Sequence, residues 1–90
     1  MTIKLFTIWD SKTEAFRYPH FVQNSGQAIR SFQEAVMDTK IELGKYPEDF
    51  SLFEMGTLDD STGVYTALNA PLNLGLGTLY VSNKEDSCKA

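Results

Sequence analysis

The chain has little of the chemistry on which most enzymes and secreted proteins depend. Its 90 residues include one cysteine, Cys88, and one histidine, His20. A single cysteine permits neither an internal disulfide nor a thiolate metal cage, so we expect a reducing, cytoplasmic setting. A histidine-based triad would have to use His20, and the sequence has no Gly-x-Ser-x-Gly turn, so we expect no catalytic residues and no cofactor. No apolar run approaches the roughly 18 residues of a membrane helix, and we expect no membrane partner.

Positive charge is also scarce, and it is unevenly placed. Eight basic residues stand against twelve acidic ones, a net charge of −4, which argues against a peptide that condenses nucleic acid by bulk neutralisation. Residues 1–46 carry six basic and five acidic side chains, whereas residues 47–90 carry two and seven. Any surface that binds an anion is therefore expected in the first half.

The first half predicts a hairpin followed by a helix. Residues 3–9 are rich in β-branched and aromatic side chains and predict a strand covered on most of both faces. Residues 15–18 predict a short second strand that Pro19 ends. The helix is the clearest element: Asn24 or Ser25 caps it, apolar residues follow at helical spacing, and it ends near residue 38 or 39. A second helical stretch at residues 40–43 is an alternative to a loop there.

The second half predicts a turn and another hairpin. Residues 46–49 form the turn, and residues 50–58 and 64–68 are strands joined by an Asp-rich loop that ends in Gly63. Residues 72–77 are ambiguous, and residues 78–81 are expected to form a last short strand. We therefore predict a single small α+β domain over residues 1–81, with a mostly antiparallel sheet of three to five short strands packed against one main helix at about residues 25–38. Residues 82–90 are expected to be a flexible polar C-terminal tail.

The segment from Phe16 to Phe21 is the strongest candidate for a binding site. It interleaves aromatic rings with cations, and a single-stranded nucleic-acid surface uses this combination because bases stack on rings while cations follow phosphates. The candidate nucleic-acid-binding residues are Lys12, Arg17, Tyr18, His20 and Arg30. The alternative is that the aromatic residues belong to the core and that Arg30 pairs with Glu34 on its helix.

Two other patterns are better explained by folding. Asp59 and Asp60 offer hard oxygen ligands, but their spacing does not match an EF-hand, and an Asp-rich turn explains them without a metal. Gly75-Leu76-Gly77 lacks the third glycine and the lysine of a phosphate-binding loop, so we interpret it as a bend. The sequence predicts no metal site.

Several segments together resemble one family. They are Trp9-Asp10-Ser11-Lys12, Pro19-His20-Phe21, Asn24-Ser25-Gly26-Gln27-Ala28-Ile29-Arg30-Ser31-Phe32, Pro47-Glu48-Asp49-Phe50-Ser51-Leu52-Phe53, Gly56 and Asp59-Asp60-Ser61-Thr62-Gly63. Over about residues 3–65 the chain resembles the small non-structural protein encoded by the fifth open reading frame of gokushoviruses, which are single-stranded DNA microviruses.

The resemblance implies a non-enzymatic phage accessory protein in the host cytoplasm. It implies a role in single-stranded DNA synthesis or in its coupling to packaging, with direct binding of single-stranded DNA as the first hypothesis. The second hypothesis is an adaptor that binds the viral replication initiator, the procapsid or a host factor without touching DNA. Because short strands leave exposed edges and a limited core, we also expect a homo-oligomer formed edge to edge or helix to helix.

Overall fold

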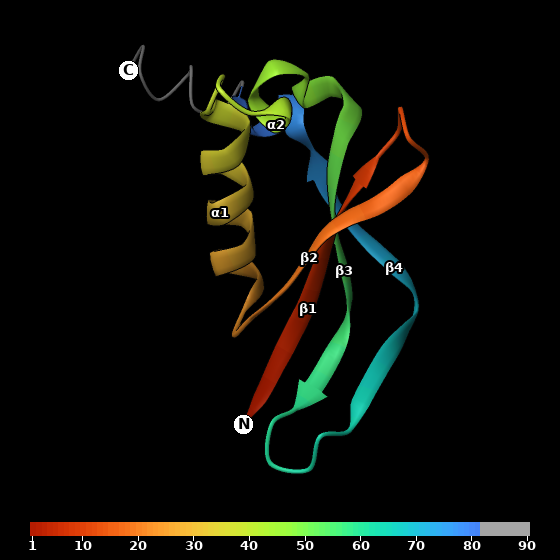
Figure 1. Cartoon of the computed structure of the whole chain (residues 1–90). Coiled ribbons are helices and arrows are strands. Elements are labelled where there is room, and N and C mark those ends of the chain that lie inside the picture. The colour runs from red at the N-terminus through yellow and green to blue at the C-terminus, as the bar shows by residue number, and fades with distance from the viewer. Residues whose placement is uncertain (82–90) are drawn as a thin grey trace.

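A computed structural model of the chain, which describes residues 1–81, has a four-stranded sheet with all its helical segments on one side (Figure 1). The elements follow in the order β1 (Thr2–Asp10), β2 (Ala15–Val22), α1 (Ser25–Met37), α2 (Glu42–Lys45), a 3-10 turn (Pro47–Asp49), β3 (Phe50–Asp59) and β4 (Tyr65–Leu76). Residues 77–81 are helical as well. The α+β class and the antiparallel sheet predicted from the sequence are confirmed.

The sheet has the strand order β2-β1-β3-β4, and every neighbouring pair is antiparallel. The prediction that Pro19 ends the second strand is wrong, since β2 continues to Val22. Proline lacks a backbone N–H, but β2 is an edge strand, and its register against β1 shifts at this point. The other edge strand, β4, is longer than the predicted strand at residues 64–68. It also contains a proline, Pro71, which an edge strand tolerates.

Helix α1 begins as its sequence predicts. The Asn24 side chain accepts a hydrogen bond from the backbone N–H of Gln27 at 2.9 Å. The Gln27 side chain accepts in turn from the N–H of Gln23 at 3.2 Å, one residue earlier than in a regular capping box. The helix ends at Met37 with Asp38 as its cap, and the predicted second helical stretch lies slightly further on, as α2.

The predicted strand at residues 78–81 is wrong, because the chain bends at the end of β4 and turns helical. Gly77 lies against the backbone of Pro47, where a Cβ atom would approach the Pro47 oxygen to 2.4 Å, so only glycine fits this bend. The turn buries Tyr80, whose ring packs edge-on against Phe32 with centroids 5.6 Å apart. Tertiary packing therefore overrides a short β-like pattern. The tail predicted at residues 82–90 lies outside the described residues.

The core lies between the helices and one face of the sheet. Its buried residues are Phe6, Ile8, Ala28, Phe32, Val36, Leu43, Phe50, Leu52 and Tyr80. The expected cover on both faces of β1 is absent within residues 1–81, because α1, α2 and residues 77–81 all pack on the same side. Ile3, Leu5 and Trp9 consequently stay only half-buried on the other face. No helix in this part of the chain is long and apolar enough to cross a membrane.

Candidate functional site

The end of β1 holds a buried carboxylate. Asp10 is 3% exposed, and its Oδ1 accepts hydrogen bonds from the N–H groups of Lys12 at 3.0 Å and Thr13 at 3.4 Å. Its Oδ2 accepts from Arg17 Nη1 at 2.9 Å. Burial opposes ionisation, but the guanidinium and the amide donors outweigh it, so the pKa of Asp10 lies below its usual range. This carboxylate fixes the β1–β2 turn and holds the Arg17 side chain.

The guanidinium of Arg17 donates hydrogen bonds to neighbouring side chains of the protein. Besides Asp10 it reaches Glu42, with Nη1 3.1 Å from Oε2, and its Nη2 donates to the Tyr18 hydroxyl at 2.7 Å. Its guanidinium carbon also lies 4.7 Å from the centre of the Tyr18 ring. The hydrogen bond to Asp10 raises the pKa of Arg17, burial works against this, and Glu42 adds to the rise. The positive charge of Arg17 is therefore already matched by two carboxylates.

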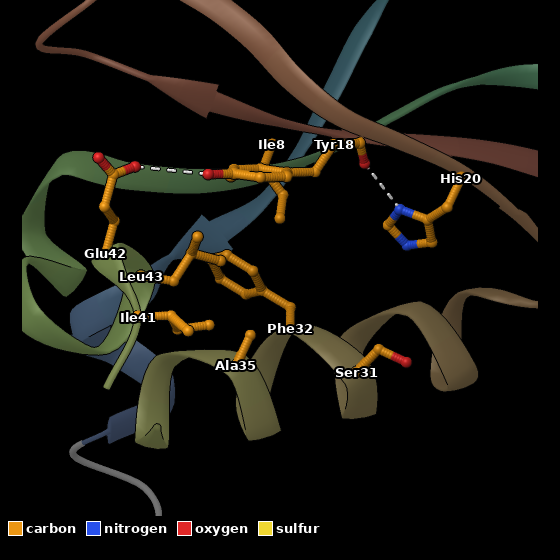
Figure 2. Close-up of a pocket in the computed structure, with 9 residues that line it drawn as sticks. All are labelled: Ile8, Tyr18, His20, Ser31, Phe32, Ala35, Ile41, Glu42 and Leu43. Carbon is orange, nitrogen blue, oxygen red and sulfur yellow. Dashed lines mark hydrogen bonds between the residues drawn. The ribbon is translucent and has the colours of Figure 1, made fainter. Parts of the chain in front are cut away.

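Tyr18 takes an unusual backbone conformation that aims its ring at α2. Ile8 pairs with Arg17 and Phe6 pairs with His20, so two residues of β2 face Thr7 alone. This bulge places Tyr18 at φ 56°, a left-handed conformation that costs a non-glycine residue about 1 kcal/mol. The ring points toward α2, where its hydroxyl lies 3.4 Å from Glu42 Oε2 (Figure 2).

His20 has a buried ring nitrogen without a hydrogen-bond partner in the described part of the chain, in the wall of the space between β2 and α1. Its Nδ1 is 2.9 Å from the carbonyl oxygen of Tyr18, and because a carbonyl only accepts, Nδ1 carries the proton. In the neutral ring, Nε2 is then an acceptor. This atom is buried and has no hydrogen-bond partner within residues 1–81, and it faces the gap between β2 and α1 (Figure 2).

The gap is an apolar groove of about 420 Å³. A groove of this size with a few convergent polar groups is typical of binding sites. The aliphatic and aromatic walls come from β1, α1 and the start of α2, while polar groups stand at the two ends (Figure 2). Its lining consists of Ile8, Tyr18, His20, Ser31, Phe32, Ala35, Ile41, Glu42 and Leu43. We call this site the β2–α1 groove.

A second hollow adjoins the groove at Glu42, and it is charged. It is lined by Asp10, Lys12, Thr13, Arg17, Glu42, Tyr46, Glu48, Asp49 and Phe50. Four carboxylates thus face two cations, which makes this hollow acidic. The groove and its acidic neighbour together offer an apolar slot beside a site that favours positive charge.

A comparison with protein families identifies the group to which this chain belongs. The family model described as "Phage ORF5 protein" matches residues 3–79. The chain belongs to this phage protein family. The match includes α1, α2, three complete strands and all of β1 except Thr2, and it extends beyond the segments that carried the resemblance. No curated protein and no solved structure matches the chain.

The structure gathers four of the five predicted site residues of this phage protein. Lys12, Arg17, Tyr18 and His20 lie on the β1–β2 hairpin and line the two adjoining hollows. Arg30 is not with them. It is exposed on α1 and lines a separate hollow with Gln33, Glu34 and Met37.

Glu42 and the α1 wall of the groove are not among the site residues predicted from the sequence. Glu42 accepts hydrogen bonds from Arg17 and Tyr18, yet it lies 25 and 24 residues further along the chain. No local spacing links residues so far apart. The helical spacing of the apolar residues predicts an apolar face on this helix, but the incomplete contact between that face and β2 has no signature in the sequence.

The Asp59–Asp60 pair serves the turn between β3 and β4. Asp59 Oδ1 accepts from Ser61, from the N–H at 3.0 Å and from the hydroxyl at 2.7 Å, and these bonds hold the pKa of Asp59 below its usual range. Asp60 pairs with the amino group of Met1 at 2.9 Å. Within residues 1–81, no group of three or more His, Cys, Asp or Glu side chains is placed to hold a metal ion.

Proposed function

We propose that this member of the phage ORF5 family is a non-enzymatic accessory protein that acts in the host cytoplasm during replication or packaging of a single-stranded DNA genome. It works by binding another protein of the phage, and the β2–α1 groove is the site that takes up the partner. The observation that carries this proposal is an apolar groove of about 420 Å³ with an unpaired acceptor in its wall.

The groove defines the chemistry of the group that it binds. Its apolar walls require an apolar body, and the bare Nε2 of His20 requires a hydrogen-bond donor on that body. The indole of tryptophan and the phenol of tyrosine combine both properties in one side chain. The proposed partner therefore inserts a tryptophan or tyrosine side chain between β2 and α1.

The adjoining acidic hollow selects the residues next to that side chain. Glu42, Glu48 and Asp49 favour lysine or arginine in the partner segment. Phosphates of single-stranded DNA would meet the same carboxylates, and Arg17 is already paired with Asp10 and Glu42. Single-stranded DNA is the competing ligand, and this charge pattern favours a protein.

Photo-crosslinking tests the groove directly. A photoreactive amino acid replaces Ser31, which is exposed at the rim of the groove, and the protein is irradiated in infected cells. We expect a crosslink to one phage protein, loss of that crosslink with the groove-filling variant Ala35→Trp, and its retention with the matched variant Ala70→Trp on β4. With the purified partner, Ala35→Trp should weaken binding at least about tenfold, the effect of losing one buried anchor. An equal crosslink or equal affinity in the two variants would contradict the proposal.

A salt titration tests the competing ligand. Fluorescence anisotropy of a labelled oligonucleotide is measured from low to physiological salt. We expect no binding, because contact with three phosphates of a single strand would give a slope of about −2 in log K against log salt. A slope of that size, lost with Lys12→Gln, would replace the protein partner by single-stranded DNA.

A further inference from the structure

The two faces of the sheet differ completely in charge. Residues paired across neighbouring strands share a face, and alternate residues along a strand point to opposite faces. Phe6 and Ile8 lie in the core, so the even-numbered residues of β1 and their paired partners point to the helices. By this register every charged residue of the four strands belongs to the helix face: Lys4, Asp10, Arg17, Glu54 and Asp59.

The opposite face, which we call the open face, is apolar and rich in aromatic side chains. Trp9 and Phe16 lie with ring centroids 4.9 Å apart, and Phe16 packs edge-on against Phe53 at 5.4 Å. Phe16, Phe21 and Tyr65 are between 42% and 48% exposed, and no element of residues 1–81 covers them. The residues that the register places on this face are Ile3, Leu5, Thr7, Trp9, Phe16, Phe21, Ser51, Phe53, Gly56, Leu58, Tyr65, Ala67, Asn73 and Leu76.

We propose that the open face binds the open face of a second copy of this chain, so that two sheets pack face to face as a homodimer. The chain has a net charge of −4, so two copies repel each other overall, but the strand residues of the open face carry no charge that would add to this repulsion. Because it has no cation either, it has nothing to hold the phosphates of a nucleic acid. In a two-fold dimer the same surface of each copy meets its counterpart, so the surface must be self-complementary. An uncharged apolar surface meets this requirement.

The edges of the sheet do not favour the edge-to-edge pairing expected from the sequence. The edge strand β2 contains Pro19 and a bulge, and the other edge strand, β4, contains Pro71 and two shifts in its register against β3. Proline and bulges at edges prevent the continuous hydrogen bonding that a joined sheet needs. A face-to-face arrangement avoids this obstacle.

The open face is large enough for a dimer. The nine residues of β1 span about 30 Å and four strands span about 19 Å, which gives about 570 Å² per copy in projection. Two copies would bury about 1,100 Å², which exceeds the roughly 1,000 Å² expected of a biological interface but lies just below the roughly 1,200 Å² at which stable interfaces begin. We therefore expect a dimer that dissociates on dilution.

Trp9 makes this dimer observable in the unmodified protein. It is the only tryptophan of the chain and lies in the aromatic cluster of the open face. Light scattering at about 200 μM should give twice the 10.1 kDa of one chain. Dilution should lower this mass and shift the Trp9 emission to longer wavelength in the same concentration range, because dissociation exposes the ring to water.

Charge introduced on the open face should break the dimer. In the variant Phe16→Glu/Phe21→Glu, like charges meet across the interface, and we expect the dissociation constant to rise by about a hundredfold or more. The control Met37→Glu changes an exposed apolar residue of α1 and should leave the dimer intact. Circular dichroism checks that both variants fold.

Four results would overturn the proposal. Three of them are a mass of 10.1 kDa for the unmodified protein at 200 μM, an equal loss of the dimer in the Met37→Glu control, and a Trp9 emission unchanged over the range in which the mass falls. Saturable quenching of Trp9 by an oligonucleotide would also overturn it, since the face would then be a platform for stacked bases. The dilution measurement needs no variant, so a variant that fails to fold does not remove the test.

Discussion

Filling the β2–α1 groove should stabilise the protein. Ala35 is half-buried on α1 and lines the groove, and Ala35→Leu adds three carbon atoms that point into an apolar space. Complete burial of these carbons would contribute about 2.4 kcal/mol at about 0.8 kcal/mol each. The groove is open to solvent and leucine is slightly less favourable than alanine in a helix, so we expect a net gain of about 1 kcal/mol in the free energy of unfolding.

Urea unfolding followed by circular dichroism measures this change. A gain of about 1 kcal/mol corresponds to a rise of about 4–8 °C in Tm for a domain of this size. The control Ala70→Leu lies on the exposed part of β4 and should stay within about 0.5 kcal/mol of the unmodified protein. A loss of 1 kcal/mol or more for Ala35→Leu would refute the reasoning, because it would mean that β2 and α1 already pack together closely and that no groove exists.

The remaining predictions concern the elements that build the site. Burial opposes ionisation of Asp10, but its hydrogen bonds, above all from Arg17, lower its pKa in the folded state below its usual range. The stability that Asp10 contributes is therefore complete above about pH 4 and is lost as the pH falls through the lowered pKa. In urea unfolding measured at a series of pH values, Asp10→Asn should reduce the fall of the urea midpoint at acidic pH. An unchanged fall would contradict this prediction. Asn24→Ala should cost about 1 kcal/mol in urea unfolding through loss of the helix cap, whereas Glu34→Ala on the same helix should cost less than about 0.5 kcal/mol; equal costs would show that the cap contributes nothing. Gly56→Ala should cost about 1–3 kcal/mol or more, since its Cβ would lie 2.4 Å from a backbone oxygen of β4, and a neutral result in thermal unfolding would show that β3 and β4 can move apart freely.

The sequence predicts well the elements whose signal is local. Helix α1 has its cap, its periodic apolar face and its end within the sequence, and all three are where expected. The hairpin at Asp59 is likewise specified by its own turn residues, which accept hydrogen bonds within the turn. These elements need no information from distant parts of the chain.

The errors occur where distant contacts decide. The local sequence of residues 78–81 predicts a strand, but the segment is helical and packs Tyr80 on Phe32. Pro19 was expected to end β2, but a bulge on an edge strand accommodates it. The site shows the same dependence on distant contacts. The sequence indicates Arg17 and Tyr18 as candidate binding residues, but their partner Glu42 is evident only once the fold places α2 beside the hairpin.

The two proposed surfaces lie on opposite faces of the same sheet, so each can be removed without the other. Phe16→Glu/Phe21→Glu introduces charge only on the open face, and neither residue lines the β2–α1 groove. Ala35→Trp fills the groove, and Ala35 lies on the helix that packs against the other face. If both proposals hold, the first variant is a monomer that binds the phage partner with unchanged intrinsic affinity, and the second is a dimer that does not bind it. A dimer also carries two grooves, so a partner with two binding segments would bind it more tightly through avidity. The monomeric variant Phe16→Glu/Phe21→Glu would lose this gain from avidity but keep the affinity of the single groove.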